Sequence, residues 1–216
     1  MKLVAKRARR DNGERLTDGG HTALNFINTC KKDGKGGYID HLGNYSGFLK
    51  WCSDLELIDL DIFMVLDLEQ YCYSKEAEGI YCSVVAARDC FDELFNSLAC
   101  GENVHPLILD RFNMHAERIN AHLSYHTGEC GLMLYWKDIH EEMNLPYWLV
   151  ISAARSLVDS GGWRKIKKCP ACSNLFMDKS RSHNKLWCNH STCGSLLKNK
   201  KYYEKKSLIK NELQLA

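Results

Sequence analysis

The sequence predicts a mainly α-helical protein (α+β), in which a helical N-terminal domain with a small β-hairpin precedes a C-terminal four-cysteine module that ends in a helix. Three observations predict this fold. Apolar residues recur at helical spacing over 81–98, aromatic and aliphatic residues flank a glycine-bearing turn at 127–131, and two cysteine pairs lie close together near the C-terminus. We expect the two domains to span residues 18–162 and 163–210.

The composition is that of an ordinary globular protein. Of its 216 residues, 45% are hydrophobic and 26% are charged. No apolar run approaches the roughly 18–20 residues that span a bilayer, and the basic first seven residues lack the apolar stretch of a signal peptide. The eleven cysteines are odd in number and mostly scattered singly, which favours a reducing compartment over a disulfide scaffold. We therefore expect a cytoplasmic protein without membrane contact.

Several helices can be placed in chain order. Asn44 or Ser46 can cap a helix that runs to about Leu57, and Pro106 begins another. The strongest helical pattern lies between them, in residues 81–98. Its predicted core-facing side carries Val84, Ala87, Phe91, Leu94, Phe95 and Leu98, and its predicted polar side carries Arg88, Asp89, Asp92 and Glu93.

A hairpin and a last helix complete the N-terminal domain. Residues 123–126 and 132–136 are predicted to pair around the turn 127–131. A helix then starts at Leu145 and is expected to end at Ser160-Gly161-Gly162, where the glycines also mark the domain boundary.

The C-terminal cysteines have the spacing of two zinc knuckles. Cys169 and Cys172 belong to a Cys-Pro-X-Cys turn, fifteen residues intervene, and Cys188 and Cys193 follow. Four such thiolates can close a tetrahedral structural zinc site. The alternatives are a dithiol redox pair, which would not need a second pair, and four unrelated core cysteines, which would rarely cluster among so many lysines.

Other candidate metal ligands fit less well. His190 lies two residues after Cys188, a reach that would strain the knuckle, so we expect it to be exposed or to lie beside the ligands. His140-Glu141 resembles the start of a zinc-protease helix, but the required second histidine is Asn144. Because a catalytic zinc keeps one position open, four available cysteines favour a closed site.

Charge is distributed unevenly along the chain. The formal net charge is +2, yet residues 164–210 contain thirteen Lys and Arg against two acidic residues, Asp178 and Glu204. The rest of the chain is therefore acidic, with 29 − 13 = 16 basic and 27 − 2 = 25 acidic residues. A basic segment on an acidic body indicates a surface for nucleic acid.

Lysines follow the last cysteine at helical spacing. Lys198, Lys201 and Lys205 line one side of a predicted helix, whose residues Leu196, Leu197 and Tyr203 are expected to pack inward. Lysines bind phosphates without reading sequence, and arginine, which pairs with guanine, is absent from this helix. The candidate nucleic-acid contacts in the module are Arg181, Lys185, Lys198, Lys200, Lys201 and Lys205.

The C-terminal third is similar to the CGNR zinc finger, and the whole chain resembles bacterial proteins that pair this finger with an N-terminal ABATE domain. The finger resemblance is carried by Lys168-Cys169-Pro170, Cys172, residues 175–181, Leu186-Trp187-Cys188 and Cys193-Gly194. The N-terminal resemblance is carried by residues 23–29, which are similar to the signature LDFVNT. The chain departs from the name-giving Cys-Gly-Asn-Arg, which here reads Cys193-Gly194-Ser195-Leu196, and Asn25 replaces the signature's Asp. The resemblance implies a mostly helical, stress-induced transcription regulator whose finger binds DNA.

Three functions are compatible with these observations. The leading hypothesis is a non-enzymatic zinc-finger regulator that binds DNA, with RNA as a second option, and whose N-terminal domain senses a ligand or a protein partner. The alternative is a zinc-stabilised protein-interaction adaptor without direct DNA binding. The third is a small-molecule sensor or enzyme with a pocket at Asn25, Asn28 and Trp136, although no paired carboxylates or Ser/His/Asp set supports catalysis.

Overall fold

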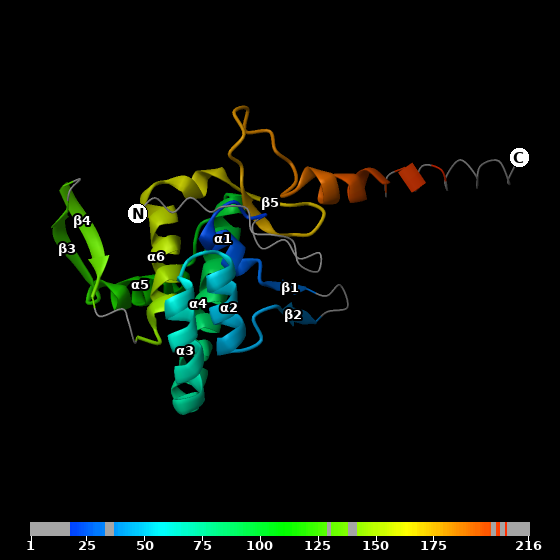
Figure 1. The fold of residues 1–216 in the computed structure, drawn as a ribbon. Coiled ribbons are helices and arrows are strands. Elements are labelled where there is room, and N and C mark those ends of the chain that lie inside the picture. Colours follow the sequence, from blue (N-terminus) through cyan, green and yellow to red (C-terminus); the bar gives the residue numbers. More distant parts are fainter. Residues whose placement is uncertain are drawn as a thin grey trace, which may run out of the picture.

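The computed structural model describes residues 18–32, 37–128, 131–137, 142–199, 202–203 and 206. These residues form a helical body with three small antiparallel hairpins, and a four-cysteine cluster followed by a helical segment (Figure 1). The predicted fold class is therefore confirmed. The helices are α1 (Thr22–Ile27), α2 (Tyr45–Asp54), α3 (Leu60–Cys72), α4 (Ser74–Cys100), α5 (Pro106–Asn120) and α6 (Leu145–Asp159).

Three hairpins are formed by consecutive strands. β1 (Cys30–Lys32) pairs with β2 (Tyr38–Asp40), and β3 (Leu123–Gly128) pairs with β4 (Gly131–Trp136). β5 (Ile166–Lys168) pairs with β6 (Leu175–Met177) and belongs to the cysteine module. A 3₁₀ turn, η1 (Gly162–Lys165), precedes β5, and a π-helical turn, η2 (His190–Gly194), contains the last cysteine of the cluster.

α4 is the central helix of the body. It packs against α1, α2, α3, α5 and α6, and the predicted apolar stripe from Val84 to Phe95 is buried. The helix is longer than predicted and ends where Gly101 adopts the left-handed conformation with φ 71°. Arg88 was predicted to lie on the polar side of the helix, opposite the core-facing stripe, but it is buried. Asp40 of β2 accepts two hydrogen bonds from it, at 2.8 and 2.6 Å, and this pairing offsets the cost of burying the charge.

The other predicted elements are also present. Asn44 caps α2, because its side chain accepts a hydrogen bond from the Gly47 amide at 2.8 Å. α5 begins at Pro106, α6 ends before Ser160, and β3 and β4 form the predicted hairpin. The pattern did not predict α3, which is apolar on most of its sides and therefore lacks a clear amphipathic period.

The cysteine module packs directly on the body. β5 and η1 contact α4, and β6 contacts α1. Ile166 and Leu175, from β5 and β6, are buried in the same hydrophobic core as the body helices. The helical segment after the cysteines extends away from the body (Figure 1). Among the described residues, no helix is both long and apolar enough to cross a membrane.

Candidate zinc centre and nucleic-acid interface

Four cysteine sulfurs converge in the C-terminal module. The Sγ atoms of Cys169, Cys172, Cys188 and Cys193 all lie within 4.8 Å of one another. The Sγ of Cys188 lies 3.6 Å from those of both Cys172 and Cys193. A tetrahedral zinc with Zn–S bonds near 2.3 Å would hold its sulfurs about 3.8 Å apart. The cluster therefore fits a closed four-thiolate zinc site.

The first knuckle is a tight turn stabilised by its own backbone. The Cys169 amide donates to the carbonyl oxygen of Asn174 at 2.9 Å, and the Ser173 amide donates to that of Cys169 at 2.8 Å. Ser173 adopts a left-handed conformation with φ 62° to complete the turn. This closure places Cys169 and Cys172 on the same side of the turn, as two ligands of one metal require.

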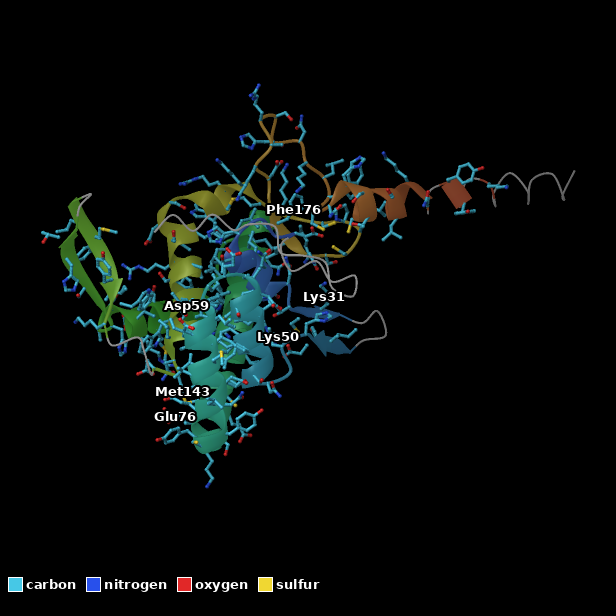
Figure 2. All side chains as sticks on the ribbon, viewed as in Figure 1. Lys31, Lys50, Asp59, Glu76, Met143 and Phe176 are labelled. Carbon is cyan, nitrogen blue, oxygen red and sulfur yellow. The ribbon has the colours of Figure 1, made fainter. Side chains whose placement is uncertain are left out.

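The second knuckle begins with Asn189, which caps η2. Its side-chain oxygen accepts hydrogen bonds from the amide and hydroxyl of Ser191 at 3.0 and 2.7 Å. Gly194 packs against the indole of Trp187, where an added Cβ would lie 3.4 Å from the ring. Phe176 is fully buried and, with the cysteines and Trp187, forms a small second core. Figure 2 shows Phe176 beside the helical body, at the base of the module.

The cysteine thiols of the cluster shift one another's pKa in opposite directions. A hydrogen bond with Cys188 lowers the pKa of the Cys172 thiol to about 5, although burial opposes this change. The same hydrogen bond, together with burial, raises the pKa of Cys188. Burial also raises the pKa of Cys193. A bound metal ion would stabilise all four sulfurs as thiolates and release the protons that they carry.

Neither His190 nor His183, the two histidines between Cys172 and Cys193 in the sequence, is part of the sulfur cluster. His190 is exposed, and its ring lies edge-on to Trp187 with the ring centres 5.7 Å apart. His183 is exposed on the loop that follows β6.

The segment around α1 holds the cysteine module through its asparagines. The Asn28 side chain donates to the carbonyl oxygen of Leu175 at 2.8 Å and accepts from the Leu175 amide at 3.0 Å. Gly19 accepts a hydrogen bond from the Met177 amide at 2.9 Å. Asn25 in turn fixes Gly19, because its side-chain oxygen accepts from the Gly19 amide at 3.0 Å. Both asparagines therefore bond to backbone groups within the fold.

Trp136 lies in a separate part of the fold. It stacks on Trp148 of α6, with the ring centres 6.1 Å apart and the planes inclined by 12°. The structure thus gives Trp136 and the two asparagines different partners. The pocket predicted from these three residues stays a prediction.

The predicted basic contacts differ in their exposure. Arg181 and Lys198 are exposed, whereas Lys185 is half-buried with its ammonium 5.2 Å from the centre of the Phe176 ring. Lys200, Lys201 and Lys205 lie outside the described residues. For the helix after the last cysteine, the prediction that apolar residues pack inward is wrong for two residues. Leu196 is 64% exposed and Tyr203 is 67% exposed, because this segment leaves the body (Figure 1).

Asp178 is a structural residue that the sequence argument missed. Its carboxylate is fully buried and accepts from Lys167 Nζ at 2.7 Å, from the Lys185 amide at 3.0 Å, and from the Ser180 amide and hydroxyl at 2.9 and 2.5 Å. The hydrogen bonds from Lys167 and Ser180 hold its pKa well below the ordinary value. The sequence did contain a signal for this role, because Asp178 is an acidic residue within a strongly basic segment.

Comparison with known protein families agrees with this geometry. Residues 165–206 match the family model of the CGNR zinc finger. The chain therefore carries a CGNR zinc finger domain. A four-cysteine cluster in this finger indicates zinc binding, so the expectation of a zinc cofactor is confirmed. No ABATE domain was detected, so this part of the resemblance stays a prediction. No match was found among curated proteins.

Proposed function

We propose that this chain is a non-enzymatic regulator that binds DNA through its CGNR zinc finger, with Cys169, Cys172, Cys188 and Cys193 as the zinc ligands. One observation carries the proposal: among the described residues of the finger, every exposed charged side chain is basic. Arg164, Lys165, Lys168, Lys179, Arg181 and Lys198 are exposed, whereas the acidic Asp178 is buried and paired with Lys167. Such a surface attracts the phosphate backbone and offers it little repulsion.

The zinc has a structural role in this proposal. It holds the two knuckles together where the small core of Phe176 and Trp187 could not do so alone. The finger thereby presents its basic side chains in a fixed arrangement. The body, which we propose spans residues 18–162, senses a ligand or partner, and the finger, residues 163–210, contacts the nucleic acid.

Salt dependence tests the proposal. Binding of the zinc-loaded full chain to duplex DNA should be measured by fluorescence anisotropy over a range of salt concentrations. About five phosphate contacts should give a log–log slope of roughly −4 to −5. The variant Lys198→Glu reverses one exposed charge outside the sulfur cluster. Its slope should be less negative than that of the wild-type chain. Affinity that does not change with salt would contradict the proposal.

The adaptor function is a second candidate because α3 exposes an apolar stripe. Leu60 is 65%, Met64 55%, Leu68 68% and Tyr71 75% exposed, and their spacing places them on one side of the helix. Capture of partners from nuclease-treated lysate by the wild-type chain and by Leu68→Glu would test it. A protein that the wild-type chain captures and Leu68→Glu does not would favour the adaptor function. Capture of the same proteins by both chains would contradict a role for the apolar stripe of α3.

A further inference from the structure

The loop that follows β6 has a fixed backbone and free side chains. Asp178 accepts from the amides of Ser180 and Lys185, as described above, and so connects the two ends of the loop. From the opposite strand, Lys167 donates to the carbonyl oxygens of His183 and Lys185. A fully buried carboxylate and a lysine thus hold an eight-residue surface segment, 178–185, in one conformation.

The tip of this loop consists of Arg181, Ser182, His183 and Asn184. All four residues are exposed, and none of their side chains has a hydrogen-bond or ion-pair partner among the described residues. His183 adopts a left-handed conformation with φ 50°, which is unusual for a residue other than glycine, and the bonds from Lys167 hold the chain there. In Figures 1 and 2 the loop stands out from the body.

The chemistry of the tip differs from that of the helix after the cysteines. Lysine contacts phosphate as a point charge, whereas arginine pairs with the O6 and N7 atoms of guanine, and asparagine pairs with adenine. The sequence of the C-terminal helix offers lysines but no arginine. Arg181 therefore supplies the guanine-reading group that this helix lacks, and Asn184 places an exposed amide on the same tip. A backbone fixed before binding also reduces the entropy lost when these side chains are ordered.

We propose that the tip loop 181–184 enters the major groove of duplex DNA and reads base edges, with Arg181 as the residue that recognises guanine. This inference rests on the proposed DNA-binding function and assigns sequence recognition to the loop. The lysines of the segment after the cysteines hold the phosphate backbone. Recognition by the loop does not depend on the Asn and Arg of the Cys-Gly-Asn-Arg motif, which this chain replaces with Ser195 and Leu196.

A selection from a randomised duplex library with the zinc-loaded full chain tests this assignment. The wild-type chain should prefer guanine at one or two positions. Arg181→Lys keeps the positive charge but loses the planar guanidinium group that pairs with guanine. Discrimination between bases at those positions should therefore fall by about 5- to 150-fold. Affinity for non-specific duplex should stay nearly unchanged. Lys198→Ala is the matched control, which should weaken binding to all sequences equally and leave the preference intact.

Zinc content establishes that each variant is folded, and Asn184→Ala provides a second variant that should relax the preference at a different position. An unchanged preference in Arg181→Lys, a wild-type chain without any preference, or tighter binding to single-stranded RNA than to duplex DNA would overturn the assignment to the loop. The first two outcomes leave salt-dependent DNA binding intact. Loss of salt dependence would instead overturn the proposed function itself.

Discussion

Two carboxylate–cation pairs hold small parts of the fold in place, one a hairpin and the other a loop. Asp40 of β2 pairs with Arg88 of α4 and fixes the β1–β2 hairpin on the central helix. Asp178 pairs with Lys167 and fixes the loop of the finger on β5. In each pair one side chain is almost completely buried, so loss of its partner would leave a charge without compensation.

At the residue scale, we predict that Asp40→Asn destabilises the body in a pH-dependent manner. Burial alone would raise the pKa of Asp40, but hydrogen bonds from Arg88 and from the Leu42 amide hold it well below the ordinary 3.8. A lowered pKa means that the stabilisation is fully present above about pH 4 and is lost as the pH falls below that value. At neutral pH the substitution should cost about 2 kcal/mol, less than the ~3–5 kcal/mol of fully buried pairs because Asp40 is 33% exposed.

Chemical denaturation of both chains at several pH values measures this effect. The stability difference between wild type and Asp40→Asn should be constant from neutral pH down to about pH 5 and should then shrink. A difference that stays constant down to about pH 3 would contradict the assigned role of the pair.

At the scale of single elements, α1 joins the body to the finger. Its residues Ala23, Leu24, Phe26 and Ile27 pack into the core of the body, while Asn28, just after the helix, bonds to both backbone groups of Leu175. Asp18 adds a link to the second knuckle, because it accepts from Asn189 at 3.1 Å. Residues 23–29 therefore form one part of the surface on which the finger docks, and α4 forms another.

We predict that Asn28→Ala weakens this docking. Two hydrogen bonds to partly buried backbone groups would be lost, at a cost of about 1–3 kcal/mol. Backbone amides of β5 and β6 should exchange faster with solvent deuterium, and zinc should be released faster to a chelator. Asn120→Ala, which removes an exposed amide that bonds to Arg155, is the matched control. Equal zinc release from the two variants would contradict the role of Asn28.

At the scale of the whole molecule, the finger and the body share a hydrophobic core. Ile166 is 4% exposed and Leu175 is 1% exposed, and both belong to the cluster formed by the body helices. Zinc holds the loops on either side of β6. Its loss should therefore affect the body as well as the finger.

We predict that removal of zinc lowers the thermal midpoint of the helical body by about 5 °C or more, since 1 kcal/mol corresponds to roughly 2–4 °C in a chain of this size. Far-UV circular dichroism with and without a chelator measures the change. Cys188→Ala should reproduce the chelated state, whereas Cys82→Ala, at an exposed cysteine outside the cluster, should not. An unchanged midpoint would show that residues 18–162 are stable by themselves.

Local patterns predicted the helices whose apolar residues recur regularly. The stripe of α4, the Asn44 cap of α2 and the proline at the start of α5 each depend on neighbours within one or two turns. The same reasoning misplaced Arg88, since its partner Asp40 lies 48 residues away. It also missed α3, where apolar residues on most sides of the helix hide the period.

The sequence by itself determined the helical class, the four-cysteine cluster and its zinc, because the spacing of knuckles and the periodicity of helices are short-range properties. Only the tertiary structure decided how the finger packs on the helical body and which of its polar side chains are buried in hydrogen bonds. Asn28 meets Leu175 across 147 positions of the chain, and Asp178 becomes buried only when the loop closes over it. Long-range pairing of polar groups leaves no periodic trace in a sequence, so these contacts emerge only when the chain is folded.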